Sequence, residues 1–401
     1  MSFTLEKKQT KAHPIRANGA TLIAEDAKNL TVVYNKYKSN CPRPNPQSQL
    51  TYNLVFCHGT GFNKSIWNYH IKKLYQLSQS LQVPWFLDTV ISADAVGHGD
   101  SSLANDGKLG PVYTWDDGAR DVIEVVQHET RTTGDLENDF NSRTVIIGHS
   151  MGGFVATYAA YLEPTLFDSV VAIEPVLFGT PDNAQLYIKL FNKISQLILD
   201  TFDTETDARF FFEKFSFTKF IHPEVMNDFI ADEIYKTKNE EGEDIYKVKC
   251  LKDVQVAAYL GSMMSLPKGM LALPALRVPF LHVIGSKAKW NPPESVAWVR
   301  GAIDPQYFVG GVDIKDGEHL VNAEKPDEVV AIIKNFLTKR DEVYTKERSE
   351  IPEVVLKGDR KALHDQEFGK LLRGDLEDIY GYELAKHAPF DLTLTKKDSK
   401  L

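Results

Sequence analysis

Short runs of hydrophobic, mostly β-branched residues alternate with longer segments of helical periodicity over much of the chain. This alternation is typical of a mostly parallel α/β sheet flanked by helices. The expected strands cover residues 54–56, 90–93, 144–147, 170–173, 280–284 and, at the end of the pattern, 307–309. Ligands of open α/β sheets bind beyond the carboxyl ends of the strands. We therefore expect the chemistry at the glycine and polar residues that end these runs.

The strand pattern stops between residues 177 and 275, where the periodicity is helical and charges are clustered. We expect an inserted helical cap there, which divides the sheet domain into residues 1–176 and 276–339. Six phenylalanines lie between residues 210 and 220, more than a helix needs to pack on a sheet. They either line a substrate pocket or only attach the cap to the core. Residues 340–401 are expected to form a charged C-terminal extension with one or two surface helices.

Residues 148–152 have the sequence Gly-His-Ser-Met-Gly, directly after an expected strand and before a helical segment. A nucleophilic serine on a strained turn between strand and helix needs glycine on both sides, because a Cβ atom there would collide with neighbouring backbone. Ser150 is therefore the candidate nucleophile. A serine hydroxyl is a weak nucleophile at neutral pH, so it requires a nearby base and a third group that orients the base.

His319 is the candidate base, because it lies in a polar loop between the last expected strand and an amphipathic helical segment. His149 is adjacent to the nucleophile and is expected to point elsewhere. The histidines of the polar end segments, among them His13 and His364, lack a comparable setting.

The carboxylate that would orient His319 is less obvious. The usual place for it follows the strand at residues 280–284, where the sequence contains no carboxylate before Glu294. Glu174 ends the neighbouring expected strand and can approach the same imidazole from one strand away. Glu174 is therefore the predicted acid. The alternatives are that Glu174 only caps local amides beside Pro175, or that Glu294 is the acid.

Two backbone amides are expected to bind the oxyanion of a tetrahedral intermediate. One belongs to Met151, the residue after the nucleophile, and the other belongs to Thr60 in the glycine-containing loop at residues 58–62. The alternative is that this loop is an ordinary turn after a strand.

The composition of the chain argues against several classes of protein. The chain has 401 residues, 43% hydrophobic and 25% charged, which is usual for a globular protein, and its net charge of −9 argues against nucleic-acid binding. Its three cysteines are widely spaced, so neither a disulfide framework nor a zinc site is expected. Residues 1–18 lack the apolar region of a signal peptide, and no apolar run is long enough to span a membrane. A soluble, non-secreted protein that needs no metal or organic cofactor is expected.

The last three residues, Ser399, Lys400 and Leu401, spell the tripeptide that the peroxisomal import receptor reads at a free C-terminus. Polar residues precede the tripeptide, as a docking tail requires. We expect import into the peroxisomal matrix; the alternative is a chance tripeptide.

The chain resembles the α/β-hydrolase superfamily and, more closely, fungal peroxisomal lipases. The resemblance rests on the loop around His319 and on residues 54–61, 94–101, 107–110, 115–122, 148–153 and 173–176. It implies the α/β-hydrolase fold with an eight-stranded sheet and a helical cap, and a peroxisomal enzyme that hydrolyses esters of lipid-like substrates. It also implies an acid after the sixth strand, as in haloalkane dehalogenase-like hydrolases, which supports Glu174. Those dehalogenases and the related epoxide hydrolases carry aspartate where this chain has Ser150, so neither activity is expected.

The sequence therefore predicts a serine hydrolase acting on a small ester substrate through Ser150, His319 and Glu174. An acyl-CoA thioesterase or a carbon–carbon bond hydrolase would use the same three residues. A non-catalytic interaction protein that keeps the fold is the alternative from another class. The sequence is compatible with a homodimer.

Overall fold

The computed structural model describes residues 2–43, 50–80, 82–179, 184–356 and 358–374. The chain divides into two units, Met1–Asp341 and Glu342–Leu401, which are described separately. The C-terminal tripeptide predicted as a targeting signal lies outside the described residues.

An eight-stranded sheet forms the centre of the first unit, with the strand order β1-β2-β4-β3-β5-β6-β10-β11. β1 and β2 pair antiparallel, β2 pairs antiparallel with β4, and all later neighbours are parallel. The strands are β1 (Phe3–Lys11), β2 (Thr31–Ser39), β3 (Thr51–Cys57), β4 (Phe86–Ala93), β5 (Ser142–His149), β6 (Ser169–Ile173), β10 (Phe280–Gly285) and β11 (Phe308–Ile314). The strands β3, β6 and β10 are buried along their whole length, which explains their continuous apolar runs. The expected α/β-hydrolase sheet is confirmed.

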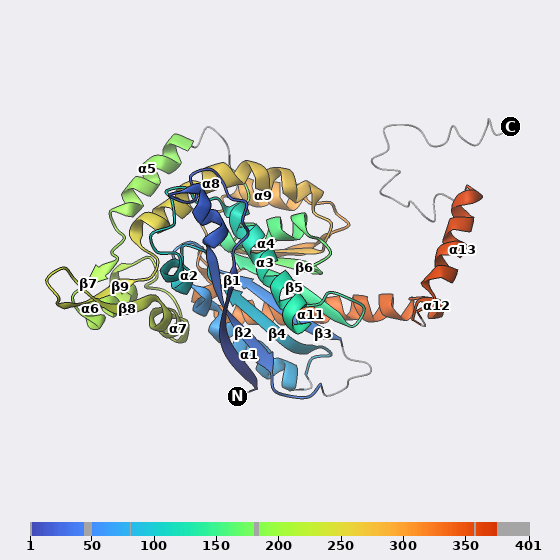
Figure 1. Ribbon diagram of the computed structural model, residues 1–401. Helices are drawn as coiled ribbons and strands as arrows, with labels where there is room; N and C mark the ends of the chain where they lie inside the picture. The colour runs from blue at the N-terminus through green and yellow to red at the C-terminus, as the bar shows by residue number, and fades with distance from the viewer. Residues whose placement is uncertain (1, 44–49, 81, 180–183, 357, 375–401) are drawn as a thin grey trace. The chain divides into compact units, whose positions relative to one another are not determined.

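Helices pack on both faces of this sheet (Figure 1). The helical segments outside the cap are η1 (Ala24–Asn29), η2 (Lys64–Trp67), α1 (Asn68–Gln79), α2 (Gly99–Ala104), α3 (Trp115–Thr133), α4 (Met151–Leu162), α9 (Pro293–Ala302), α10 (Val321–Glu324) and α11 (Pro326–Ser349), the last of which continues into the second unit. The helix α4 begins directly after Ser150 and is almost entirely buried between α3, the sheet and the cap. Small residues along α4 allow this close packing, which fixes the position of its N-terminus.

The cap between β6 and β10 is not entirely helical. It contains α5 (Ala184–Ser195), α6 (Glu205–Phe210), the π-helical turn η4 (Phe211–Phe215), α7 (Pro223–Glu233), α8 (Lys252–Ala272) and η5 (Leu273–Ala275). It also contains a small antiparallel sheet, β7-β9-β8, formed by β7 (Thr201–Phe202), β8 (Ile234–Lys238) and β9 (Asp244–Val248). The sequence did not indicate these strands, because they are half-exposed and rich in charge and therefore lack a hydrophobic run.

The second unit contains the end of α11 and two further helices, α12 (Glu353–Leu356) and α13 (Arg360–Leu372). The side chain of Asp359 caps α13 by accepting a hydrogen bond from the amide of Ala362 at 3.1 Å. No described residue of α13 is buried, as expected for a surface helix.

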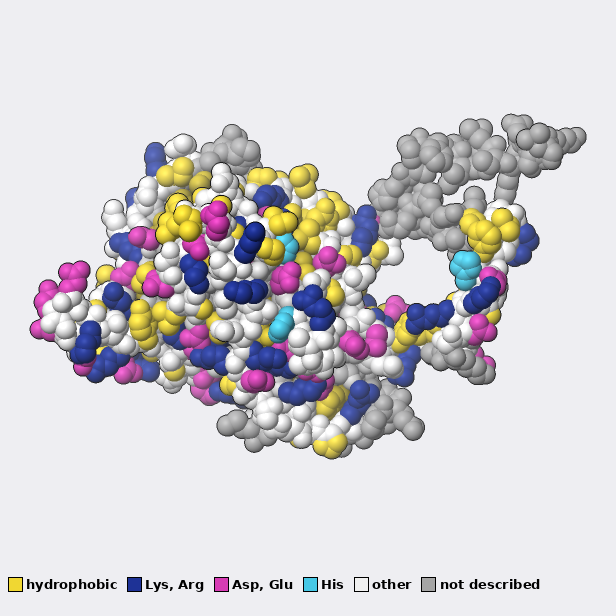
Figure 2. Space-filling model, in the orientation of Figure 1, with side chains coloured by type: hydrophobic (Ala, Val, Ile, Leu, Met, Phe, Trp, Pro, Cys, Tyr) yellow, Lys and Arg dark blue, Asp and Glu magenta, His cyan; other side chains and the backbone are white. Residues whose placement is uncertain are grey.

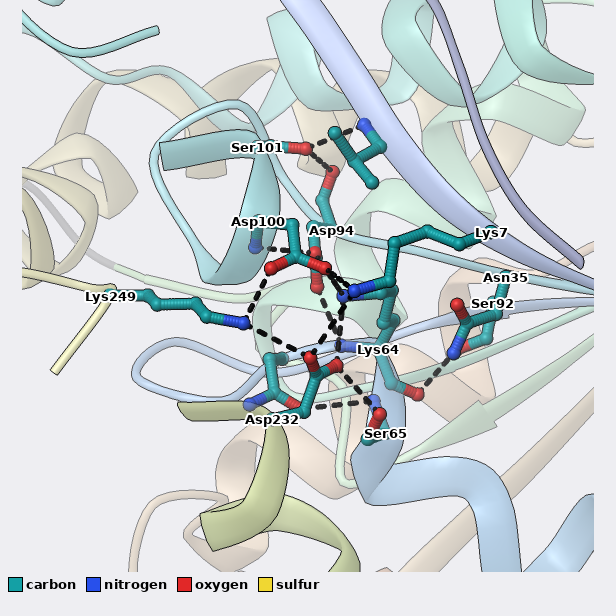
Figure 3. A network of polar contacts seen from close by, with 12 residues as sticks. Lys7, Asn35, Lys64, Ser65, Ser92, Asp94, Asp100, Ser101, Asp232 and Lys249 are labelled. Atoms are coloured by element: carbon teal, nitrogen blue, oxygen red, sulfur yellow. Dashed lines mark hydrogen bonds and ion pairs between the residues drawn. The ribbon is translucent and has the colours of Figure 1, made fainter. Parts of the chain in front are cut away.

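A buried cluster of charges attaches the cap to the sheet domain (Figure 3). The fully buried ammonium of Lys64 lies 2.8 Å from a carboxylate oxygen of each of Asp94, Asp100 and Asp232. Lys249 pairs with Asp100 and Asp232 in addition. Asp94 and Asp100 belong to the sheet domain, whereas Asp232 and Lys249 belong to the cap. Because a buried charge without a partner is costly, these residues fix this side of the cap on the loop that follows β3.

Replacing Lys64 by methionine is expected to lower the free energy of unfolding by about 3–5 kcal/mol, since it leaves the buried carboxylate of Asp94 without a cation. Urea denaturation measures this loss. The matched control is Lys72→Met, which removes a half-exposed ion pair with Asp228 and should cost less than about 1 kcal/mol. Equal losses in both variants would show that the cluster does not stabilise the fold.

Candidate active site

Ser150 lies on a strained turn between β5 and α4. Its backbone has φ 55° and ψ −117°, a conformation that a non-glycine residue adopts only when its surroundings impose it. A Cβ atom on Gly152 would collide with the carbonyl oxygen of Cys57, and a Cβ atom on Gly148 would collide with the backbone of Gly152. The amide of Ser150 donates to the carbonyl of Ile173 in β6 at 3.1 Å. These contacts explain the two glycines of the motif and hold the serine at the carboxyl edge of the sheet.

The structure places His319 beside Ser150. The Nε2 atom of His319 lies 3.0 Å from the Oγ atom of Ser150, and its Nδ1 atom lies 3.1 Å from Oε2 of Glu174. The histidine stands in the loop between β11 and α10, where Gly317 lies directly against Gly285 at the end of β10. A carboxylate only accepts hydrogen bonds, so Nδ1 carries the proton and Nε2 is free to accept one from the serine hydroxyl.

Glu174 follows β6 and is completely buried. Its carboxylate accepts hydrogen bonds from the amide of Gly285 at 2.6 Å and from Nδ2 of Asn291 at 2.8 Å, besides its contact with His319. The alternative acid, Glu294, is exposed on α9. The sequence did not single out Asn291; the only signal for it was a polar residue shortly after a predicted strand end.

The loop after β3 and the start of α4 lie beside the nucleophile. A Cβ atom on Gly59 would lie 3.2 Å from the Cβ atom of Ser150, so the loop that contains Thr60 runs directly past the serine. The side chains of Thr60 and Met151 are in contact, with Oγ1 3.5 Å from Sδ. Within the described part of the chain, neither the amide of Thr60 nor that of Met151 donates to another protein group.

His58 orients this loop, a role that the sequence did not reveal. Its Nε2 atom accepts a hydrogen bond from the amide of Ala95 at 3.0 Å, so its Nδ1 atom carries the proton and donates to the carbonyl of Gly59 at 2.9 Å. Burial lowers the pKa of His58, which keeps the ring neutral. In a planar trans peptide the C=O and N–H bonds point in opposite directions. Holding the carbonyl of Gly59 therefore turns the amide of Thr60 away from His58.

His149 is buried beside the nucleophile and supports the loop of His319. Its Nε2 atom lies 2.8 Å from the carbonyl oxygen of His319, which can only accept, so Nε2 is the protonated nitrogen. Burial and the neighbouring His319 lower the pKa of His149 to about 3. It does not contact Ser150 as a base, as expected, but it holds the histidine that does.

A run of aromatic rings connects His319 with the cap. The Trp290 ring lies 5.8 Å from the His319 ring and stacks on Phe191 of α5, which stacks in turn on Tyr259 of α8. The surroundings of the site are therefore apolar and aromatic on this side.

The phenylalanines between residues 210 and 220 have different surroundings. Phe217 contacts Phe62 of the loop after β3 at 5.8 Å and so joins the cap to the sheet domain, although its side chain is 46% exposed. Phe212 is buried and packs on Phe229 of α7 within the cap. Phe210, Phe215 and Phe220 are exposed as well.

Among the residues that the structure describes, no group of three or more histidine, cysteine or acidic side chains is arranged to hold a metal ion. The three cysteines are free. In the same part of the chain, no helix has the length and hydrophobicity to cross a membrane.

The fold and the strained turn at Ser150 are consistent with membership of a known family. The alpha/beta hydrolase family matches residues 54–332, more than half of the chain, and the chain belongs to this family of hydrolases.

Several known proteins are similar to this chain in sequence or structure. The chain is 28% identical to the peroxisomal membrane protein LPX1 of Saccharomyces cerevisiae over 91% of this chain and 95% of that protein. The crystal structure of peroxisomal alpha-beta-hydrolase Lpx1 from that yeast superimposes with a TM-score of 0.77 and covers 93% of this chain and 98% of the other. Human monoglyceride lipase is 26% identical over half of this chain and 56% of its own. The type I acyl-CoA thioesterase mpaH' of Penicillium brevicompactum is 26% identical, but over only 34% of its length.

The lowered pKa of His149 predicts a pH dependence of stability. Unfolded histidine has a pKa near 6.5, so between about pH 6.5 and about pH 3 the unfolded chain binds a proton at His149 that the folded chain does not. The stability that this group contributes is present above pH 6.5 and is lost as the pH falls. Relative to His149→Gln, wild type should therefore lose about 1.4 kcal/mol of unfolding free energy per pH unit below about pH 6.

Urea denaturation of both proteins at a series of pH values tests this prediction. Comparing wild type with His149→Gln cancels the contributions of the other titrating groups to the unfolding free energy. A difference between them that does not change with pH would contradict the assignment of His149 as a neutral, buried ring.

Proposed function

We propose that this protein is a serine hydrolase that cleaves carboxylic esters of lipid-like substrates, with Ser150 as nucleophile, His319 as base and Glu174 as the acid that orients the base. The observation that carries the proposal is the continuous chain of hydrogen bonds from Ser150 Oγ through His319 to Glu174, at 3.0 and 3.1 Å. Folding alone does not require a serine with φ 55° to point at a histidine.

In the proposed mechanism, His319 Nε2 takes the proton of Ser150 as Oγ attacks the ester carbonyl, and Glu174 stabilises the imidazolium that forms. The amides of Thr60 and Met151 donate to the oxyanion of the tetrahedral intermediate. His319 then protonates the leaving alcohol, and an acyl-enzyme remains. A water molecule that loses its proton to His319 attacks the acyl carbon, and the carboxylic acid and free Ser150 are released.

Two features support an apolar acyl group. The Trp290 ring packs beside His319 and continues into a stack with Phe191 and Tyr259, and Phe62 in the loop after β3 contacts Phe217 of the cap. The similarity to monoglyceride lipase agrees with this chemistry. A thioester substrate is the second candidate, because 41% of the chain is similar to a type I acyl-CoA thioesterase.

We also propose that the protein acts in the peroxisomal matrix and that the import receptor binds its C-terminal Ser399-Lys400-Leu401. The similarity to a peroxisomal membrane protein over almost the whole chain supports the peroxisome as the organelle, and the matrix is inferred from the tripeptide alone.

Fluorophosphonate labelling tests the nucleophile, and a panel of esters and acyl-CoA thioesters graded by acyl length tests the substrate class. Wild type should be labelled and should prefer esters with longer acyl chains, whereas Ser150→Ala should neither be labelled nor turn over any member. A wild-type protein that is not labelled and cleaves nothing would overturn the proposal. Turnover of thioesters alone would show that the protein is a thioesterase and not a carboxylic ester hydrolase.

A further inference from the structure

The outer face of α5 and the turn that follows it expose four leucines. Leu186 and Leu190 lie one helical turn apart and are 63% and 40% exposed, and Leu197 and Leu199 are 73% and 49% exposed. Four large apolar side chains so close in sequence form more apolar surface than scattered surface residues do.

The charge of this segment differs from that of the whole protein. Residues 184–199 contain Lys189 and Lys193 and no acidic residue, although the chain as a whole has a net charge of −9. Both lysines are exposed, and the helix positions place them beside Leu186 and Leu190. In Figure 2, hydrophobic and basic side chains stand next to each other over the region where Figure 1 shows α5. The segment is thus a basic amphipathic helix with leucines at its outer surface.

The inner face of the same helix adjoins the catalytic histidine. Phe191 is buried and stacks on Trp290, and Trp290 lies 5.8 Å from the ring of His319. These two ring contacts connect α5 with the proposed active site. A molecule that binds the outer face of α5 therefore lies close to the proposed active site.

We propose that α5 is a docking surface for an anionic phospholipid membrane, with the four leucines among the acyl chains and Lys189 and Lys193 at the headgroup phosphates. Apolar side chains flanked by lysines are the combination that an interfacial helix needs, and a negatively charged lipid surface complements the local positive charge. This proposal rests on the proposed function, which it deepens: the lipid-like substrate is taken from a membrane surface and not from solution.

Vesicle sedimentation tests the docking surface. The probe is vesicles of equal parts phosphatidylserine and phosphatidylcholine, and the protein is the full chain carrying Ser150→Ala, so that binding does not depend on turnover. The variants Leu186→Ser/Leu190→Ser and Lys189→Glu/Lys193→Glu should each lower the partition coefficient about tenfold or more. Binding should also weaken as salt is added and on pure phosphatidylcholine.

Matched controls change exposed residues of the same kinds elsewhere. Leu22→Ser/Ile23→Ser removes two apolar side chains that are 65% and 58% exposed, and Lys11→Glu/Lys28→Glu reverses two exposed lysines. Both controls should bind vesicles as the parent does. The thermal unfolding midpoint of every variant checks that the fold is retained.

The outcomes separate the two proposals. Vesicle binding that is absent, or equal in the α5 variants and the controls, overturns the docking surface even if the wild type hydrolyses esters in solution. Loss of a dimer in the α5 variants, seen by light scattering without vesicles, overturns it too and makes a second copy of this chain the occupant. Binding that depends on α5 in a protein that cleaves no ester supports the membrane surface and contradicts the proposed function alone.

Discussion

The geometry of the site depends on the hydrogen bonds that the buried carboxylate of Glu174 accepts. It accepts hydrogen bonds from Gly285 at the end of β10, from Asn291 before α9 and from His319 after β11. Three separate segments thus converge on one side chain that is excluded from solvent. Burying a carboxylate without hydrogen-bond donors would cost free energy. The carboxylate therefore holds Gly285, Asn291 and His319 in place and fixes the tautomer of the histidine.

Strand order explains why this carboxylate can reach the histidine. The strand β6 lies between β5, which ends at His149 next to Ser150, and β10. Because the three strands are parallel, their carboxyl ends lie at the same edge of the sheet. The backbone after β5 and β6 turns sharply there, with φ 55° at Ser150 and φ 46° at Glu174. Hydrogen bonds from both of these amides to carbonyls of the next strand hold the strained turns in place.

Much of this arrangement could be predicted from local sequence. Buried parallel strands appear as apolar runs, the glycines around Ser150 report a turn without room for side chains, and the polar loop around His319 stands out between a strand and a helix. Glu174 could be predicted only as a strand-end carboxylate, with Glu294 as a rival. In the structure Glu174 is buried against His319, whereas Glu294 is exposed.

Other parts could not be predicted because they depend on contacts between distant segments. The amide of Asn291 and the neutral ring of His58 look ordinary in the sequence, and their partners lie far along the chain or in another loop. The cluster around Lys64 joins residues more than 160 positions apart, Lys64 and Asp232 among them. The small cap sheet carries charge instead of an apolar run, so periodicity does not reveal it.

The central claim is that Glu174 orients His319 for proton transfer from Ser150. It is tested most directly by comparing kcat/KM of Glu174→Gln and Glu294→Gln on the preferred ester. The account predicts a loss of about 10³- to 10⁴-fold for Glu174→Gln, because an amide favours the wrong tautomer of the histidine, and a near wild-type value for Glu294→Gln. The reverse result, with activity lost only in Glu294→Gln, would contradict it.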